Sequence, residues 1–175
     1  MSRYVIFLDI DGVFTSKRAH LASNRIDDEM WIHFDPIAIQ FMNRLDDQYD
    51  IDWVLMSTWV HGVDKFDDTA RHWAVAAFRN AGFVGNFPNP NWKTEDPDKE
   101  AGFSFNDRAL VVKKYLDAER LTYADFLIFD DTDYKFNDVL GIKRFIQTDP
   151  QEGLLSKHMF KALSLTGNWK SKYDV

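Results

Sequence analysis

The sequence contains no cysteine. A chain without cysteine has no disulfide framework, no thiolate metal ligand and no cysteine nucleophile, so its chemistry must rely on oxygen and nitrogen groups. This agrees with a reducing cytoplasm, the location we expect. No apolar run approaches the length needed to cross a bilayer, and Asp9 interrupts the first apolar stretch where a signal peptide would continue. We therefore expect neither export nor membrane insertion.

Positive charge is also scarce. The 21 Lys and Arg residues against 28 Asp and Glu residues give a formal net charge of -7. Nonspecific affinity for nucleic acid comes largely from basic side chains that neutralise backbone phosphates, so tight binding of this kind is not expected. The local sequence KRAHLASNR, residues 17–25, is basic without an acidic residue. A solvated loop is the simpler interpretation of this segment, and local binding of an anion is the alternative.

What the chain does contain is an alternation of short apolar runs with amphipathic segments. Its 175 residues, 45% of them hydrophobic, suit one domain, residues 1–175, with a substantial core. The apolar runs predict strands at Tyr4–Leu8, 53–56, 126–129 and 143–147. Helical spacing and capping residues predict helices at Pro36–Gln48, 64–80, about 106–118 and 154–165.

Strands that alternate with helices predict an α/β fold, a doubly wound, Rossmann-like parallel sheet with helices on both faces. Two details can be tested against a structure. The helix at 64–80 is expected to pack through one stripe made of Phe66, Ala70, Trp73, Ala77 and Ala81. Residues 83–106, which include PNPNWKTEDPDKEAGF, are expected to form a long surface loop, with at most a short strand near 83–84.

Small polar or acidic residues follow three of the predicted strands. Asp9 ends the first strand and Asp11 lies just beyond it, Ser57 ends the second, and Asp130 and Asp131 end the third. Ligands of wound parallel sheets bind beyond the carboxyl ends of the strands. The sequence therefore predicts that these side chains converge in one crevice.

Four carboxylates in one crevice would repel each other and become partly protonated unless a cation held them. Oxygen ligands without histidine or cysteine favour magnesium, so the crevice predicts Mg²⁺ as cofactor. Gly12 allows the chain to turn sharply after the first pair of aspartates. For any one of these aspartates taken alone, a turn or a helix cap is the ordinary role.

The motifs DIDGV and FDD, with Ser57 at a strand end between them, resemble the haloacid dehalogenase (HAD) superfamily in the order in which its motifs occur. More narrowly, the chain resembles the HAD domain of Swiss-army-knife RNA repair proteins. The segments that carry this closer resemblance are MSTW at 56–59, RALVVKKYL at 108–116, FDDTD at 129–133 and QTDPQEGL at 147–154. The family varies substrate selectivity through cap insertions. Neither 16–35 nor 83–105 is long enough for a cap domain, so a HAD-like fold with a minimal cap or none is expected, with an open crevice.

The resemblance implies a role for each of these residues. Asp9 would attack phosphorus and become an aspartyl phosphate, and Asp11 would act as acid and then base. Magnesium would be held by Asp9, the backbone carbonyl of Asp11, Asp130, and Asp131 either directly or through water. The phosphate would be bound by the Ser57 hydroxyl, with the adjacent Thr58 as the alternative.

The family also places a lysine or arginine on the helix before the DD strand, to meet the charge of the transferred phosphoryl group. Arg108 begins that predicted helix at the carboxyl edge of the sheet, whereas Lys113 and Lys114 lie about 7 to 9 Å further along its axis. An arginine there also offers a bidentate fork to phosphate where the helix dipole favours an anion. Arg108 is therefore our first candidate, and Lys93, in the polar segment 83–106, is the rival.

We expect a magnesium-dependent phosphohydrolase that acts on a phosphorylated small molecule or nucleic-acid end, most specifically a nucleotide or a polynucleotide terminus. Trp59 and Trp92 could stack on a base, and burial in the core is the alternative for each. A phosphatase or phosphotransferase for sugar or protein phosphates is a second interpretation. A third is a catalytically silent module that binds phosphates within a nucleic-acid repair system.

Overall fold

The computed structural model describes residues 3–22, 33–61, 64, 66–96, 105–122, 125–141 and 144–174. Its four strands form one sheet in the order β2-β1-β3-β4, and every pairing is parallel. The strands are β1 (Tyr4–Leu8), β2 (Ile51–Leu55), β3 (Phe126–Asp130) and β4 (Phe145–Gln147). The α-helices are α1 (Lys17–Ala22), α2 (Pro36–Gln48), α3 (Asp68–Asn80), α4 (Arg108–Glu119), α5 (Phe136–Leu140) and α6 (Ser156–Leu165), and the 3₁₀ turns are η2 (Thr58–Val60) and η4 (Phe105–Asp107).

Strand β1 lies in the middle of the sheet, with β2 on one side and β3 on the other. In register, Leu8 is opposite Leu55 and also opposite Phe129. The residues that follow, Asp9 on β1 and Asp130 on β3, therefore leave the sheet side by side. The order of the strands reverses at β1, and this reversal is the place where wound α/β sheets form their ligand crevice.

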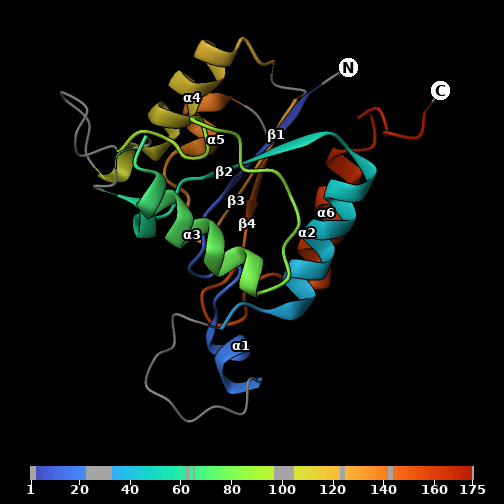
Figure 1. Cartoon of the computed structure of the whole chain (residues 1–175). Helices are drawn as coiled ribbons and strands as arrows, with labels where there is room; N and C mark the ends of the chain where they lie inside the picture. Colours follow the sequence, from blue (N-terminus) through green and yellow to red (C-terminus); the bar gives the residue numbers. More distant parts are fainter. Residues whose placement is uncertain are drawn as a thin grey trace.

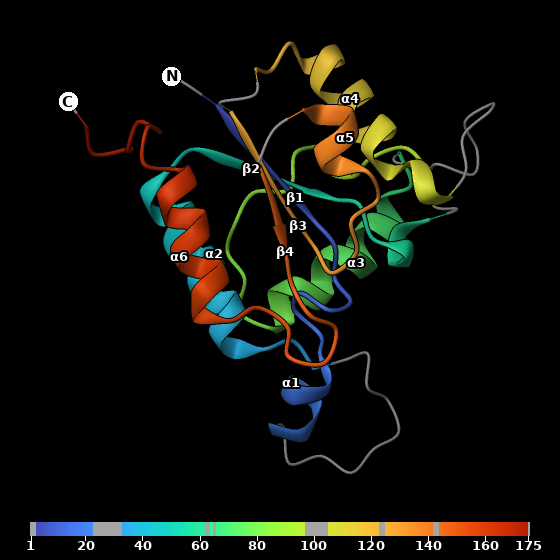
Figure 2. The same ribbon diagram turned by 180° about the vertical axis from the view of Figure 1, so that it is seen from behind.

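Alternate side chains of the strands point into two separate hydrophobic clusters. Ile6 and Leu8 join the cluster that includes residues of α2, α3 and α6, whereas Val5 and Phe7 join the cluster that includes residues of α4 and α5. Figures 1 and 2 show the same division, with α2 and α6 side by side on one face and α4 and α5 on the other. The expected doubly wound α/β fold is therefore confirmed.

Helix α2 has the bounds that its capping residues predict. The Asp35 carboxylate accepts a hydrogen bond from the Ile37 N–H at 2.9 Å, and Pro36 occupies the first turn, where a missing N–H costs nothing. Phe41 and Leu45 are buried as their spacing predicts. Ile37 does not share their environment, because its side chain is 55% exposed at the start of the helix.

Helix α3 begins four residues later than expected, and its packing differs in part from the expected stripe. Phe66 lies before it and is 68% exposed, and Trp73 is 58% exposed. Among the described side chains of α3, Ala74 and Phe78 are buried, and Phe78 contacts the ring of Phe14 at a centroid distance of 5.1 Å. Of the expected stripe, Ala77 is half-buried and Ala81 packs against the core, whereas the Ala70 side chain lies outside the described part.

Of the expected surface loop at 83–106, residues 83–96 form neither a helix nor a strand, and residues 105–106 begin η4. Several side chains of 83–96 are nevertheless buried rather than at the surface. Phe83, Phe87 and Trp92 are each at most 2% exposed. The backbone follows the outer edge of β2, where the Leu55 N–H donates to the Trp92 carbonyl and the Leu55 carbonyl accepts from the Thr94 N–H, both at 2.9 Å. The contacts with β2 are isolated bridges at residues 86 and 93, and no strand forms at 83–84. Residues 97–104 lie outside the described part of the chain.

The described part of the basic segment 17–25 is helix α1 rather than a solvated loop. Ser16 caps this helix by accepting a hydrogen bond from the Ala19 N–H at 3.1 Å. Arg18 forms an ion pair with Asp35 and donates to the Glu152 carbonyl at 2.8 Å, so it joins α1 to the start of α2 and to the turn before α6. Figure 1 shows α1 beyond the carboxyl ends of the strands. Residues 23–25 lie outside the described part.

Smaller differences concern the ends of elements. Strand β2 begins two residues earlier than expected, β3 extends through Asp130, α6 begins at Ser156, and the short helix α5 was not expected.

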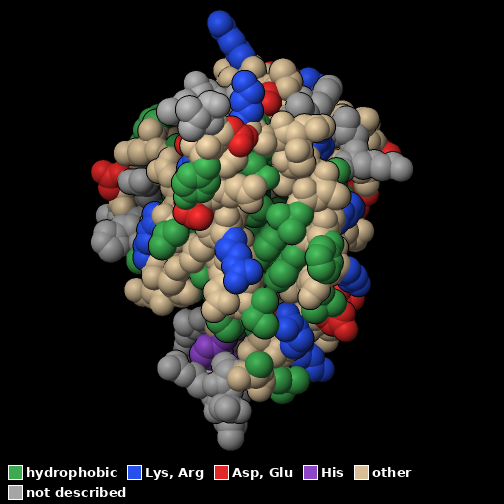
Figure 3. Space-filling model, turned by 90° about the vertical axis from the view of Figure 1, so that its right-hand side faces the viewer, with side chains coloured by type: hydrophobic (Ala, Val, Ile, Leu, Met, Phe, Trp, Pro, Cys, Tyr) green, Lys and Arg blue, Asp and Glu red, His purple; other side chains and the backbone are tan. Residues whose placement is uncertain are grey.

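None of the described helices is both long enough and apolar enough to cross a membrane. Figure 3 shows the side of the molecule that carries α2 and α6, where hydrophobic and basic side chains are interleaved.

Candidate active site

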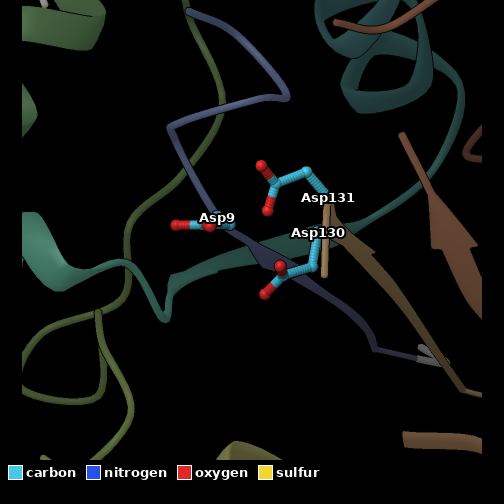
Figure 4. A group of neighbouring side chains, drawn as sticks. All are labelled: Asp9, Asp130 and Asp131. Carbon is cyan, nitrogen blue, oxygen red and sulfur yellow. The ribbon is translucent and has the colours of Figure 1, made fainter. Parts of the chain in front are cut away.

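Three carboxylates meet beyond the ends of β1 and β3. Asp9 follows β1, and Asp130 and Asp131 come from the end of β3 and project toward Asp9 (Figure 4). One oxygen of each lies within 4.8 Å of an oxygen of each of the others. Asp9 is 5% exposed, Asp130 is fully buried and Asp131 is partly exposed. A hard divalent cation would find three oxygen ligands here, with one side open to solvent.

The absence of a side chain at Gly12 leaves room for Asp131 in this cluster. Its φ of +69° is in the left-handed region that glycine adopts without cost. A Cβ atom at this position would lie 2.4 Å from the Asp131 Oδ2 atom and 2.6 Å from the Asp131 Cβ atom. Any other residue would therefore displace the carboxylate as well as strain the turn.

The guanidinium of Arg108 is in contact with the cluster. Its Nη1 atom lies 2.9 Å from the Asp130 Oδ2 atom and 3.3 Å from the Asp9 Oδ2 atom. The side chain is 2% exposed, and its guanidinium carbon lies 4.4 Å from the ring centroid of Tyr134. Because Arg108 is the first residue of α4, the helix holds it at the carboxyl edge of the sheet.

Burial dominates the electrostatics of the cluster. It raises the pKa of Asp9 above its ordinary value, although the nearby charge of Arg108 acts in the opposite direction. Burial and the charge of Asp9 raise the pKa of Asp130 well above its ordinary value. Burial alone would lower the pKa of Arg108, but the charges of Asp9 and Asp130 raise it. One arginine therefore does not balance the carboxylates, and a bound cation would favour their ionised form.

Backbone and hydroxyl donors orient the carboxylates. The Ile10 N–H donates to the Asp9 Oδ1 atom at 2.8 Å, and the buried Ser57 side chain acts to lower the pKa of Asp9, against the larger effect of burial. The Thr132 N–H donates to the Asp130 Oδ1 atom at 2.9 Å. Ser57 therefore lies with the nucleophile candidate at the end of β2, as the strand-end pattern predicts.

Asp11 is held apart from this cluster. The Thr15 hydroxyl donates to its Oδ1 atom and the Trp59 indole N–H donates to its Oδ2 atom, each at 3.0 Å. Among the described residues, its carboxylate is not one of the three that converge. If Asp11 contributes to a metal site, the contribution would have to come from its backbone carbonyl, which leaves its carboxylate available for proton transfer.

The remaining candidates lie in different surroundings. Thr58 is exposed at the start of η2. Lys93 is 5% exposed beside Leu55, and its ammonium group donates to the Thr94 carbonyl at 3.3 Å. Trp92 is fully buried in the core, so stacking on a base is excluded for this residue. Lys113 pairs with Asp117 on the outer side of α4.

A family model described as "HAD domain in Swiss Army Knife RNA repair proteins" matches residues 5–159. The chain belongs to this family. No curated protein and no solved structure matches it. The match begins in β1 and ends within α6, so it includes every strand and all of the aspartates described above. The domain thus belongs to a phosphatase-like superfamily, and the resemblance drawn from its motifs is confirmed.

Several residues of this HAD domain site were missed by the sequence analysis. Thr15 and the indole N–H of Trp59 hold Asp11, and Tyr134 lies against the Arg108 guanidinium. The Gln147 side chain donates to the Asp131 carbonyl at 3.0 Å from the end of β4. Thr15 and Gln147 adjoin recognisable motifs, which is a signal that could have found them. Nothing in the local pattern indicates the Trp59 contact, which joins residues 48 positions apart.

Proposed function

We propose that this HAD domain is a magnesium-dependent phosphomonoesterase that forms an aspartyl phosphate on Asp9 and acts on a nucleotide or a nucleic-acid end. The observation that carries the proposal is that Asp9 and Asp11, only two positions apart in the sequence, lie in different surroundings. Asp9 lies in the carboxylate cluster against Arg108, whereas Asp11 is held outside it by Thr15 and Trp59. This separation supports different roles for the two carboxylates, with Asp9 as the nucleophile and Asp11 as the group that transfers a proton.

In the first step, an oxygen of Asp9 attacks phosphorus, and the bond from phosphorus to the leaving oxygen breaks. The Ile10 N–H holds the Asp9 Oδ1 atom and thereby fixes the direction of the carboxylate. Asp11 gives its proton to the leaving oxygen, so that an alcohol departs rather than an alkoxide. In the second step, Asp11 takes a proton from water as the water oxygen attacks phosphorus. The bond from phosphorus to the Asp9 oxygen breaks, so inorganic phosphate leaves and the Asp9 carboxylate is regenerated.

Arg108 meets the negative charge of the phosphoryl group. Its guanidinium already contacts the carboxylate cluster, and packing against Tyr134 keeps the guanidinium in place before the substrate arrives. A preorganised cation of this kind stabilises charge that develops in the transition state. The Ser57 hydroxyl, whose influence on the pKa of Asp9 indicates that it lies near that carboxylate, would donate to a phosphate oxygen as well.

Asp9, Asp130 and Asp131 would hold the magnesium ion, with the Asp11 carbonyl as the further ligand. When bound, the ion would offset the repulsion between the Asp9 carboxylate and the phosphate. The residues fit such an ion because three oxygens converge and because burial without it raises the pKa values of Asp9 and Asp130. The nucleic-acid part of the proposal is supported by the RNA repair context in the family description.

A phosphate-release screen tests the function. The substrates are mononucleotides, oligonucleotides phosphorylated at the 3' or the 5' end, sugar phosphates and phosphopeptides, each with magnesium and with excess chelator. We expect release from nucleotides or oligonucleotide ends that needs magnesium. Calcium is expected to inhibit, because its larger and looser coordination would misplace the nucleophile. Full activity in chelator would exclude the metal role. Phosphate binding without release would instead indicate a silent binding module.

A further inference from the structure

A large cavity adjoins the acid/base side of the site. It has a volume of about 970 Å³ and lies between α1, the start of α2, η2 and α3. Its lining includes Arg18, Phe34, Trp59, Trp73, Ala77 and Asn80. Cavities of about 300 to 1,000 Å³ are typical of sites for small organic ligands. None of the carboxylates of the metal cluster lines it, so the cavity is not the phosphate site itself.

Trp59 links the cavity to Asp11, the proposed acid and base. Its ring forms part of the wall, while its indole N–H donates to the Asp11 carboxylate at 3.0 Å. Asp11 protonates the leaving oxygen in the proposed reaction, so the leaving group must lie on the Asp11 side of phosphorus. The cavity therefore adjoins the side of the site on which the proposed reaction places the leaving group.

The walls suit a flat aromatic ring with polar edges. Trp59 and Trp73 lie 5.8 Å apart between ring centroids, and Phe34 lies 6.1 Å from Trp59. Trp73 is 58% exposed although it belongs to a helix that buries other apolar side chains, so its indole is available to a ligand. The Asn80 side chain, at the same cavity, adds an amide oxygen and an amide NH2 group that can form hydrogen bonds, whereas the Arg18 guanidinium is already held by Asp35 and the Glu152 carbonyl. An alkyl chain would make no use of these polar groups.

We propose that this cavity binds the base of the nucleotide that carries the scissile phosphate, with the base stacked on Trp59 and Trp73. The proposal rests on the phosphatase function proposed above and names the part of the substrate that this surface selects. Stacking of a base on an aromatic side chain is sequence-tolerant, because every base has an aromatic face. The site would thus favour nucleotides over sugar phosphates without a strong preference among bases.

Two substrates that differ only in the base test the proposal. Adenosine 5'-monophosphate and ribose 5-phosphate share the same phosphate ester, and the ratio of their kcat/KM values measures the contribution of the base. We expect this ratio to fall about tenfold or more in Trp73→Ala. Phe160→Ala is the matched control, because Phe160 is 71% exposed on α6 and is not among the residues that line the cavity. The ratio should be unchanged in this control.

Binding of adenosine, which has no phosphate, separates the cavity from the reaction. Tryptophan fluorescence should show saturable binding to the wild type and to Asp9→Asn, and binding at least about tenfold weaker to Trp73→Ala. If no substrate releases phosphate but adenosine binds in this way, the phosphatase function fails and the base site stands. If Trp73→Ala changes neither the ratio nor adenosine binding, the base site is wrong. Hexanol that binds as tightly as adenosine would also overturn it, in favour of an apolar chain.

Discussion

The two ends of the sheet each place an arginine among carboxylates, but in different surroundings. At the amino end, Arg3 pairs with Asp52 on β2 and with Glu119 at the end of α4, the latter at 3.1 Å. The Arg3 side chain is 42% exposed there. At the carboxyl end, Arg108 is 2% exposed and lies against Asp130.

The charge balance differs as well. The amides of Asn86 and Asn91 donate to Asp52 and Glu119 at 2.7 Å and 2.8 Å, so neutral donors complete the amino-end cluster and tie residues 83–96 to the sheet. The carboxyl-end cluster has three carboxylates, and the guanidinium of Arg108 is in contact with it. The same residue types therefore form a balanced cluster at one end, and at the other leave negative charge that a bound cation could offset.

The largest expected effect comes from removing the nucleophile. Asp9→Asn should lower kcat on the order of 10⁴-fold or more, because it removes the carboxylate that we propose as the nucleophile. Folding should survive, since the substitution preserves shape and relieves repulsion in a buried cluster. Phosphate release and thermal unfolding of the same preparation measure the two effects. An Asn variant with a substantial fraction of wild-type turnover would rule out the aspartyl-phosphate mechanism.

Removal of the buried arginine should have the next largest effect. Arg108→Ala is expected to reduce kcat/KM by about 10²-fold, the scale for loss of a preorganised donor to the transition state. Arg108→Lys should be intermediate, because it keeps the charge but loses the planar fork that packs on Tyr134. Lys113→Ala, which removes an exposed ion pair, is the control and should have little effect.

Lys93→Ala decides between the two cations that the sequence analysis proposed. If Lys93 proved essential and Arg108 dispensable, the segment at 83–96 would supply the phosphate-binding cation and our assignment would be wrong. If both matter, the loss on removing Lys93 should vary with substrate length.

A smaller effect is expected from the indole N–H that holds Asp11. Trp59→Phe keeps an aromatic ring at the wall of the cavity but removes the donor to the Asp11 Oδ2 atom. We expect kcat to fall about tenfold, a fraction of what general acid catalysis contributes, with KM little changed. The pH dependence of kcat should shift, which a purely structural role of the ring would not cause. An unaltered pH profile and kcat would mean that Thr15 alone positions Asp11.

The pH dependence of stability should also distinguish the two ends. In excess chelator, the raised pKa values of Asp9 and Asp130 mean that the folded protein holds protons that the unfolded chain releases. The free energy of unfolding should therefore fall as pH rises from the ordinary carboxyl value of 3.8 through the raised values. Denaturant titrations across this range should show a shallower fall for Asp9→Asn. An equal fall in the variant would contradict the assignment.

The smallest effect is expected at the amino end. Arg3→Ala should lower the free energy of unfolding by about 0.5 to 1 kcal/mol, because its ion pairs are partly exposed and screened by solvent. The kcat/KM for any phosphorylated substrate should remain at the wild-type value. Denaturant unfolding and phosphate release of this variant can be compared directly with those of Arg108→Ala. A loss of activity in Arg3→Ala would mean that the two ends are coupled.

The strand ends and the residues that follow them could be read from the sequence, because a buried strand that stops at an aspartate is a strong local pattern. The match of α2 to its prediction has the same origin, since Asp35 and Pro36 specify the first turn. These features depend on residues close to one another in the chain. They account for the cluster of Asp9 and Asp130, whose convergence follows from the parallel register.

Features that depend on distant partners could not be read in this way. Helix α1 is short and is held by the contact of Arg18 with Asp35, which no helical pattern indicates. The packing stripe of α3 is selected by Phe14 and other rings that reach Phe78 from elsewhere in the fold. Residues 83–96 have the polar composition of a loop, yet their backbone forms hydrogen bonds with β2. Such bonds do not depend on the identity of the side chains, so the sequence pattern does not indicate them.

The placement of residues 83–96 has a consequence for association between chains. An uncovered sheet edge offers unpaired N–H and carbonyl groups with which another strand can pair, and this is a common route to aggregation. Here the outer edge of β2 already exchanges hydrogen bonds with residues 86 and 92–94 of its own chain. On the opposite side, the edge strand β4 is only three residues long. Within the described residues, the sheet that carries the carboxylate cluster therefore presents little unpaired backbone with which a strand of another chain could form hydrogen bonds.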